Sequence, residues 1–267
     1  MSTFRLTALG AVVFAFSALA QASDPNCWVR GVGTTFGNVS NSSSSNPMDS
    51  NILPDAADFL YDNTTDIPTS VGSAYINTSG YAQYGAMRLT TYAAIEGSGT
   101  VGSTTQPPAG TNPGYNLGFK DQIEFWTPSI AFGAPLDWQI CLTLKSFTSG
   151  FSPTASSTSA SVRLGSNPAM NLSHAASGTQ STFICRTYTI ANGDSLSLFG
   201  GLGNSVLASG AGSYYLGSEI EVTIRPLTNP NAVFSSCSGY AYAVPEPGSL
   251  AAIGAGLLLL ARRRRKA

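Results

Sequence analysis

Residues 138–145 read WQICLTLK, and the alternation of apolar and polar side chains in this stretch decides the fold class. Its four large apolar side chains, Trp138, Ile140, Leu142 and Leu144, fall at every second position. Successive side chains of a β-strand point to opposite faces of the sheet, whereas a helix would need apolar residues three or four positions apart. The stretch therefore predicts a β-strand with one buried face.

The same pattern recurs along the chain, and helix patterns barely occur. In residues 219–225, apolar and polar side chains alternate, and residues 182–190 are rich in the β-branched and aromatic side chains that strands favour. Further strands are expected at residues 82–92, 122–126, 161–164, 195–199 and 240–244, with Gly-, Pro- and Ser-rich loops at residues 97–114 and 149–161. Many short strands with such breaks predict an all-β fold, a single β-sandwich that is jelly-roll-like.

Three short stretches depart from the strand pattern. Residues 53–61 form the one helix-like stretch, and the Ser- and Asn-rich residues 41–46 are expected to form a flexible loop. Residues 200–203 read GGLG, and because neither a basic residue nor a helix follows them, we expect a turn there rather than a phosphate-binding loop.

The N-terminus has the features of a secretory signal peptide. Arg5 is its one cation, an apolar stretch covers residues 6–19, and residues 20–22 read AQA, a small-x-small cleavage pattern. We expect export through the Sec translocon with cleavage after Ala22, or alternatively after Ala20. The mature protein would then begin near Ser23.

The C-terminus, residues 244–266, reads VPEPGSLAAIGAGLLLLARRRRK and combines three elements in order. Pro245, Glu246 and Pro247 come first, and because the prolines fix φ and lack an N–H, this triplet stays extended and accessible. An uncharged run at residues 250–261 follows, as in a membrane helix. The chain then carries a stop-transfer basic cluster of Arg262, Arg263, Arg264, Arg265 and Lys266. Five adjacent cations are costly to move through a bilayer, so this end is expected to stay cytoplasmic and the body periplasmic.

The apolar run is short for a permanent anchor. Its 12 residues span about 18 Å as a helix, against a hydrocarbon core of about 30 Å. Including Gly248 and Ser249 and letting the arginine side chains reach back to the interface narrows this gap in length without closing it. We therefore expect a transmembrane helix over about residues 249–261 that serves a temporary membrane intermediate, with an ordinary C-terminal anchor as the alternative.

This tail resembles the PEP-CTERM sorting signal of Gram-negative bacteria, in which a PEP triplet, a hydrophobic segment and a basic cluster follow one another. The resemblance implies recognition by exosortase, a membrane-embedded protease that would cut near residues 245–247 and release or re-anchor the protein. It also implies a setting of exopolysaccharide and biofilm, at the cell surface or outside the cell. The chain then divides into a signal peptide at residues 1–22, an exported domain at residues 23–243 and a sorting signal at residues 244–267.

The charge of the body excludes one class of partner. Residues 23–243 carry 13 acidic and 7 basic side chains, and this charge of −6 is masked by the basic tail in the whole-chain value of −1. An acidic surface repels phosphate groups, so we expect no nucleic-acid partner.

Four cysteines form an even set in an exported chain, which predicts two disulfides. Three pairings are open, and we favour Cys27 with Cys237, which would tie the ends of the domain together, and Cys141 with Cys185, which would join two core strands. Zinc binding is the alternative, but there is no CxxC pair and the spacings are wide.

Catalytic patterns are weak. The one histidine, His174, falls in residues 171–174, which we expect to be a loop, and no GxSxG motif is present to supply a serine nucleophile. Glycosidases use two carboxylates about 5–10 Å apart, and Glu124 with Glu219 or Glu221 is the pair worth considering. Such residues are ordinary on an exposed strand face, so we expect no catalytic residue and no enzyme, with a surface glycan hydrolase as the alternative.

Four acidic residues lie 3, 4 and 4 positions apart: Asp55, Asp58, Asp62 and Asp66. On a helix they would share one face, which we interpret as a solvated acidic surface. A Ca²⁺ site with Asn63 as a further oxygen ligand is the alternative, and it would make the protein a calcium-dependent adhesin. We expect no metal and no cofactor.

Aromatic residues are numerous for a chain so poor in charge. They are Tyr61, Tyr75, Tyr81, Tyr84, Tyr92, Tyr115, Trp126, Tyr214, Tyr215 and Tyr240. Sugar rings stack on aromatic faces while Asn and Asp bond the hydroxyls, although packing in the core is the usual role of any one aromatic residue. The leading hypothesis is therefore an exported protein with a structural or carbohydrate-adhesive role, with an exopolysaccharide as a partner.

Overall fold

The computed structural model describes residues 27–39, 42–52, 59–70, 72–104, 116–150, 155–175 and 178–242. Within these ranges the chain forms strands and turns and no helix. The strands are β1 (Trp28–Val39), β2 (Ser42–Ile52), β3 (Phe59–Thr69), β4 (Gly72–Gln83), β5 (Ala86–Glu96), β6 (Gly99–Thr104), β7 (Leu117–Trp126), β8 (Pro135–Gly150), β9 (Ala155–Leu164), β10 (Met170–Ala175), β11 (Thr179–Ala191), β12 (Ser195–Ser209), β13 (Gly212–Pro226) and β14 (Val233–Ser236).

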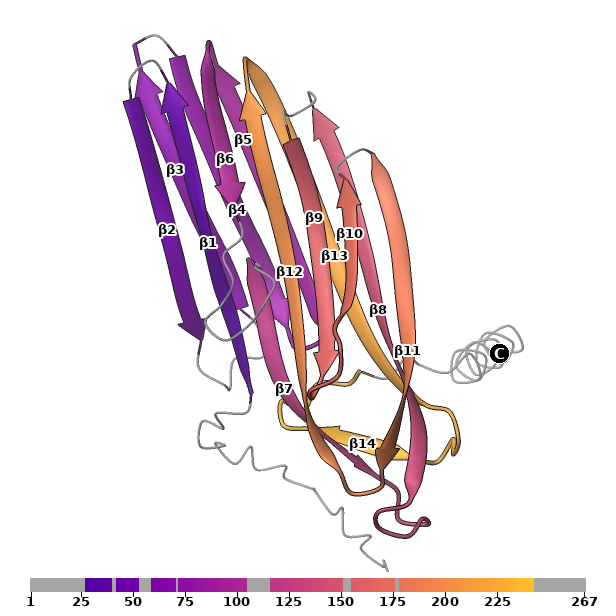
Figure 1. Ribbon diagram of the computed structural model, residues 1–267. Helices are drawn as coiled ribbons and strands as arrows, with labels where there is room; N and C mark the ends of the chain where they lie inside the picture. The colour runs from indigo at the N-terminus through magenta and orange to yellow at the C-terminus, as the bar shows by residue number, and fades with distance from the viewer. Residues whose placement is uncertain are drawn as a thin grey trace, which may run out of the picture.

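The strands make two antiparallel sheets that pack face to face (Figure 1). The eight-stranded sheet has the order β10-β9-β12-β6-β1-β7-β14, with β2 on β1, and the six-stranded sheet has the order β11-β8-β13-β5-β4-β3. The all-β prediction is confirmed, and the arrangement agrees with a sandwich. The jelly-roll connectivity stays a prediction, and the signal peptide and C-terminal helix lie outside the described residues.

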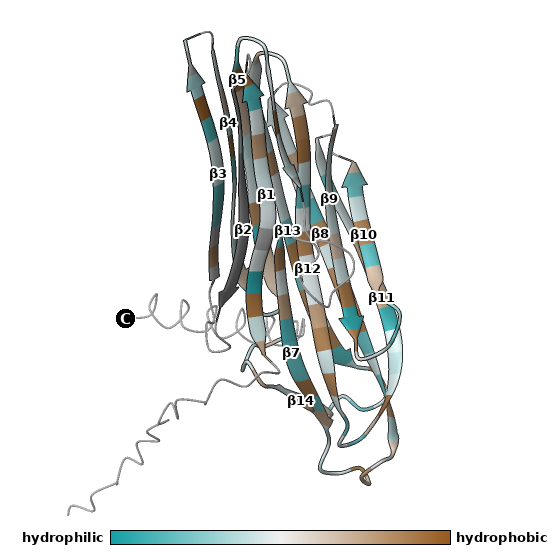
Figure 2. Cartoon of the chain, turned by 60° about the vertical axis from the view of Figure 1, so that its left-hand side comes forward, coloured by the Kyte–Doolittle hydropathy of each residue, from teal (hydrophilic) through white to brown (hydrophobic). Residues whose placement is uncertain are grey.

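The stretch WQICLTLK lies in β8, between β11 and β13. Trp138, Ile140, Leu142 and Leu144 are fully buried, and the intervening side chains are more exposed. The predicted alternation is therefore confirmed at this strand. Figure 2 shows the same alternation as bands of apolar and polar residues along many of the strands.

The strands β6 and β7 occupy the same position in the eight-stranded sheet, one after the other along its length. Each pairs with β1 on one side and β12 on the other. The short β14 pairs with β7 beyond the point where β1 begins, because Trp28 lies opposite Lys120 and Ser236 lies opposite Ile123. The last strand of the body, β14, therefore lies in line with the first strand, β1, beside β7.

Several predicted loops are strands in the structure. Residues 42–46, expected in a flexible loop, belong to β2, and residues 99–104 and 155–161, expected in loops, belong to β6 and β9. Backbone ladders with β1 and β12 hold these segments in place. Pairing by the main chain needs no particular side chain, so composition alone misjudged them.

Three other expectations are wrong in detail. Residues 59–61, expected to be helical, begin β3, while residues 53–58 lie outside the described residues. The expected single strand at residues 82–92 is broken by a turn at Gly85, whose φ of +77° suits glycine. Residues 240–242 form no strand, and residues 243 and 244 lie outside the described residues.

The GGLG sequence lies inside β12 rather than in a turn. A Cβ on Gly200 would stand 2.2 Å from the ring of Phe119, so glycine here leaves room for a core aromatic side chain. Gly200 thus reflects packing between neighbouring strands, since it lies opposite Phe119 in the β7–β12 ladder.

Candidate functional site

The body ends in a segment that packs back against its core. Tyr242, the last described residue, is 1% exposed and contacts the rings of Phe119, Phe234 and Tyr240 at centroid distances of 6.5, 6.4 and 4.9 Å. The backbone N–H of Ile224 in β13 donates to the Tyr242 carbonyl oxygen at 3.0 Å. The chain is therefore fixed to the fold up to three residues before Pro245.

A buried carboxylate, Asp121 of β7, holds this segment. It accepts hydrogen bonds from the Tyr242 hydroxyl at 2.8 Å, from the Ser238 backbone N–H at 3.2 Å, from the Ser238 hydroxyl, and from the Gln122 backbone N–H at 2.8 Å. Burial of a carboxylate is tolerated when several donors replace its water. Burial, and next the Asp121 charge, raise the pKa of Tyr242 well above its ordinary value, so the phenol stays neutral and donates.

The disulfide Cys27–Cys237 closes the same corner across a sequence separation of 210. Cys237 follows β14 and Cys27 precedes β1, so the bond joins the neighbouring ends of two strands that lie in line. Among the described residues, Cys27, Asp121 and Cys237 are the group with metal-ligand atoms close together, but the two sulfurs are bonded to each other and are not free thiolates.

The second disulfide, Cys141–Cys185, links β8 and β11 at positions that lie directly opposite in register. These two bonds are the favoured pairing of the three that the sequence left open. Cys141–Cys185 ties strand to strand, whereas Cys27–Cys237 joins the residue before β1 to the residue after β14.

The outer face of the six-stranded sheet carries an aromatic strip, defined here as Tyr75, Tyr92, Tyr215 and Phe147. These residues come from β4, β5, β13 and β8, which are neighbours in the sheet. Tyr75 contacts Tyr92 at 6.1 Å between ring centroids, and Phe147 contacts Tyr215 at 6.0 Å. Tyr92 lies opposite Tyr215 in register, so the two pairs form one strip across four strands.

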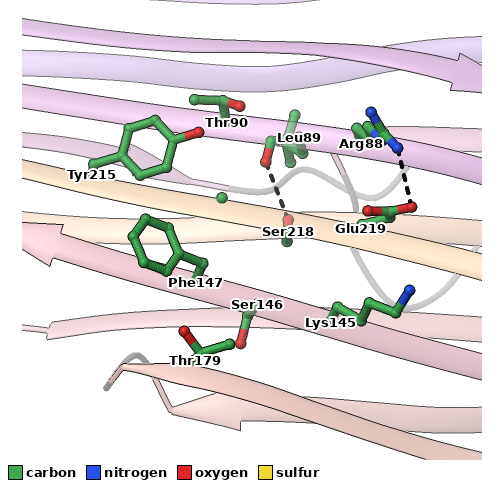
Figure 3. Close-up of a pocket in the computed structure, with 11 residues that line it drawn as sticks. Arg88, Leu89, Thr90, Lys145, Ser146, Phe147, Thr179, Tyr215, Ser218 and Glu219 are labelled. Carbon is green, nitrogen blue, oxygen red and sulfur yellow. Dashed lines mark hydrogen bonds and ion pairs between the residues drawn. The ribbon is translucent and has the colours of Figure 1, made fainter.

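A shallow groove of about 370 Å³ lies along one part of this strip (Figure 3). The rings of Phe147 and Tyr215 lie at one end, and Gly217 stands opposite Phe147 in register. A Cβ on Gly217 would come within 3.2 Å of the Tyr215 ring, so the glycine lets this ring lie flat over the strand. The groove is thus open and lined on one side by aromatic faces.

Charged residues line the other end of the groove. Arg88, Glu219 and Lys145 form a row in register across β5, β13 and β8. Arg88 pairs with Glu219 at 3.4 Å between Nη2 and Oε1, and both side chains are exposed. Such a pair is screened by water and adds little to stability, so these groups are available to bond a polar ligand.

A second polar group lies at the far end of the strip. Asn77, opposite Tyr92 in register, donates to Asp62 Oδ1 at 2.5 Å and to Thr64 Oγ1 at 2.7 Å. Asp62 and Asp66 lie on strand β3, so the predicted helical face of four aspartates is wrong for these two. Asp55 and Asp58 lie outside the described residues.

His174 lies in β10 and not in a loop, which corrects the sequence expectation. Its side chain is buried between the sheets, with Nδ1 2.7 Å from the Ser146 hydroxyl and Nε2 2.8 Å from the Thr182 hydroxyl. Desolvation by burial lowers the pKa of His174 from its ordinary value of 6.5. A neutral imidazole held by two hydroxyls is a packing group between sheets here.

The carboxylates considered as a glycosidase pair are not brought together. Glu124 is exposed on the outer face of the eight-stranded sheet, and Glu219 and Glu221 lie on the outer face of the six-stranded sheet. The core separates the two faces. Glu124 instead accepts a hydrogen bond from the Ser235 hydroxyl at 3.5 Å.

The predicted aromatic residues divide between core and surface. Tyr84 and Tyr214 are buried, Tyr75, Tyr92 and Tyr215 belong to the aromatic strip, and Trp126 is exposed elsewhere. Tyr81 and Tyr240 are half-buried, and the side chains of Tyr61 and Tyr115 lie outside the description.

Sequence reasoning missed Phe147 and Asp121, although each breaks the alternation of its strand. Phe147 is apolar at a position where β8 turns polar side chains outward, and Asp121 is charged in the inward series of Phe119, Ile123 and Phe125. A side chain that breaks the alternation of apolar and polar residues along a strand is therefore the sequence signal that could have identified both residues.

Comparison with protein families identifies the tail and assigns no family to the body, residues 23–242. A family model described as the PEP-CTERM protein-sorting motif matches residues 243–266, which begin directly after Tyr242. The match covers Pro245, Glu246 and Pro247 and the basic cluster, and it indicates a protein that exosortase sorts to the cell surface. No curated protein sequence matches the chain. None of the described residues belongs to a helix suited to crossing a membrane.

Proposed function

We propose that this chain is an exported structural protein of the cell surface or extracellular matrix that binds polysaccharide through the aromatic strip. The observation that supports this role is the arrangement of Phe147, Tyr215 and Gly217 beside the polar row of Arg88 and Glu219 (Figure 3). Exposed aromatic rings in a strip across a sheet offer a sugar chain a continuous stacking surface. Polar side chains at both ends supply donors and acceptors for hydroxyl groups.

The exposure of the aromatic strip fits this role better than a purely structural one. Phe147 and Tyr92 are 48% and 39% exposed although the body has a well-filled core for aromatic side chains. Large apolar side chains that gather on one surface mark interaction sites more often than isolated ones do. The open, shallow shape of the groove suits an extended polymer, which gains affinity from many weak contacts.

The route to the surface follows from the tail. The body would reach the periplasm through Sec, remain attached through residues 249–261, and be cut by exosortase near residues 245–247. The fold supports this order, since Asp121 and the Cys27–Cys237 disulfide fix the chain up to Tyr242 and leave the triplet just beyond. Cleavage there would leave the body intact.

Binding tests the proposed role. We expect Phe147→Ala and Tyr215→Ala each to weaken binding to a panel of immobilised exopolysaccharides by about fivefold, because each removes a stacking face worth about 1 kcal/mol. Phe183→Ala is the matched control, since Phe183 is 74% exposed on β11 of the same sheet and does not line the groove. Equal binding by the parent and all three variants would contradict the assignment.

Mass spectrometry tests the route. The mature protein recovered from the medium and the envelope should begin near Ser23 and end near residues 245–247. An intact chain dissolved in the cytosol, with its basic cluster present, would contradict both export and processing.

An activity assay tests the hydrolase alternative. Turnover of a polysaccharide that is abolished by Glu124→Gln or Glu221→Gln would replace the adhesive role with that alternative.

A further inference from the structure

Four large apolar side chains are exposed at one end of the two-sheet body: Trp126, Phe132, Leu227 and Val233. Their exposed fractions are 48%, 83%, 45% and 51%. Trp126 ends β7, Phe132 lies in the connection from β7 to β8, Leu227 follows β13, and Val233 begins β14. We call these residues the apolar tip, and their elements meet at the lower end of the body in Figures 1 and 2.

The four residues are brought together by pairing. Val233 lies opposite Trp126 in the β7–β14 ladder, and the Leu227 backbone N–H donates to the Asp137 carbonyl oxygen at 2.8 Å, close to the start of β8. The connection that carries Phe132 leads directly into β8. Side chains from two sheets therefore reach the same end.

The exposure of Phe132 is built into an ordered connection. Buried Asn192 accepts from the Thr127 N–H at 2.7 Å and donates to the Thr127 and Ile130 carbonyl oxygens at 3.1 and 2.9 Å. Its backbone pairs with Gly133 and Ala134, each at 2.8 Å. The Phe132 ring lies over Gly193, where a Cβ would come within 2.1 Å of it. The fold thus fixes a large apolar ring outside its core.

The same end lies near the point where the chain leaves the body. Tyr242 is hydrogen-bonded to Ile224, three residues before Leu227, and to Asp121, five residues before Trp126. At about 3.3 Å per strand residue these intervals are about 10 and 17 Å. The seven residues from Tyr242 to Ser249 reach at most about 25 Å when extended. The apolar tip is therefore within reach of the bilayer that the tail enters, whereas the other end of the 16-residue β8 lies about 50 Å away.

We propose that the apolar tip rests in the headgroup layer of the inner membrane while the tail is inserted, and this inference rests on the membrane intermediate of the proposed function. Tryptophan and phenylalanine favour the interface between water and lipid, and apolar side chains gain by leaving water there. Charged residues beside the tip are Glu124 and Arg225, two positions from Trp126 and Leu227, Asp194, next to the Gly193 that the Phe132 ring covers, and Asp137, whose carbonyl oxygen bonds Leu227. They are three acids and one base. Contact is therefore apolar in origin, independent of anionic lipid and of salt.

Such contact would set the orientation of the body during processing. It would hold Tyr242 and the following triplet close to the membrane surface, where a membrane-embedded protease acts. Release by cleavage would then leave the tip free in the mature protein.

Tryptophan quenching tests the proposal on the full-length chain in phosphatidylcholine vesicles, with and without bromine on the upper acyl chains. The chain has three tryptophans, of which Trp138 is buried in the core and Trp28 lies back along the sheet opposite Lys120. We expect brominated lipid to reduce the Trp126 fluorescence about twofold, and Trp126→Phe to abolish this change. The effect should persist in phosphatidylcholine alone and at high salt.

Two further variants separate the tip from the tail. Phe132→Ser combined with Leu227→Ser should reduce the quenching of Trp126, while near-ultraviolet circular dichroism stays unchanged because both side chains are outside the core. In the Trp126→Phe background, Leu207→Trp should not be quenched, since Leu207 is 36% exposed towards the opposite end of the body, beside β6.

The outcomes distinguish the two proposals. Equal quenching in parent and Trp126→Phe, with the chain resistant to carbonate extraction, would overturn the tip contact and leave the membrane intermediate standing. A chain that carbonate removes from the vesicles would overturn both. Self-association through the tip without vesicles would identify a second copy as the occupant and overturn the lipid assignment.

Discussion

The two core clusters of the body differ in the side chains that fill them. The larger cluster, the aromatic core, contains Trp138, Phe119, Phe125 and Tyr242, all fully buried. The smaller cluster, the aliphatic core, consists of Val39, Ala74, Ile76, Ala93, Ile95, Val101, Val206, Ala208, Tyr214 and Leu216, with a single aromatic ring. Beside it the interior is polar, where Thr35 bonds Asn63 at 3.2 Å and Thr65 at 2.7 Å.

This difference shows where the fold is held most firmly. Large aromatic side chains bury more apolar area than Ala or Val, and ring pairs such as Phe125–Trp138 at 4.9 Å add to it. The Cys27–Cys237 disulfide and Asp121 lie in the same half, and the tail leaves from it. Stability is therefore concentrated at the base of the sorting signal.

The largest effect should come from the disulfide in the aromatic core. We expect Cys27→Ser with Cys237→Ser to lower the free energy of unfolding by about 5 kcal/mol, because reduction frees a loop whose ends are 210 residues apart. Cys141→Ser with Cys185→Ser removes a bond that closes a separation of 44 and should cost about 4 kcal/mol. Urea unfolding of both double variants measures the difference. Both bonds lie beside the aromatic core, so a greater loss in the second pair would show that the length of the closed loop does not set their relative contributions.

The next effect should come from the buried carboxylate. We expect Asp121→Asn to cost about 3 kcal/mol, because the amide gives up the charge-assisted hydrogen bonds and places an N–H donor where the carboxylate accepts from the Tyr242 and Ser238 hydroxyls. Tyr242→Phe removes one of these hydrogen bonds and should cost about 1 kcal/mol. Both are read from urea unfolding midpoints.

Thr35→Val is the matched change in the polar interior of the other half. It removes a buried hydroxyl that bonds two side chains and should cost about 1 kcal/mol. If this loss equalled that of Asp121→Asn, the two halves would be held alike and the comparison would fail.

The sequence predicted the strands whose side chains alternate and missed those held by the main chain. β8, β11 and β13 were found because one face of each is apolar or β-branched. β2 and β6 are rich in Ser, Gly and Thr and take their place through ladders with β1. Pairing partners far apart in the chain leave no mark on local composition, so these strands required the structure.

The candidate sites were predictable to different degrees. The tail was readable because its triplet, apolar run and basic cluster are local. The aromatic strip was not, since Tyr75, Tyr92, Tyr215 and Phe147 meet only through the order of four strands. Cysteine spacing left three disulfide pairings open. Cys27 and Cys237 meet because β1 and β14 pair with successive parts of β7 and lie in line.

The smallest effect should come from His174, which lies outside both clusters. Its pKa in the fold is below the ordinary value of 6.5 because burial disfavours the charged form. The unfolded chain therefore binds the proton more readily, so this contribution to stability is present above pH 6.5 and is lost as the pH falls through the lower folded pKa. The difference in unfolding free energy between parent and His174→Gln should shrink as the pH falls below 6.5. Glutamine keeps a donor and an acceptor for Ser146 and Thr182 without titrating, so a difference that did not change with pH would show that the histidine does not carry this dependence.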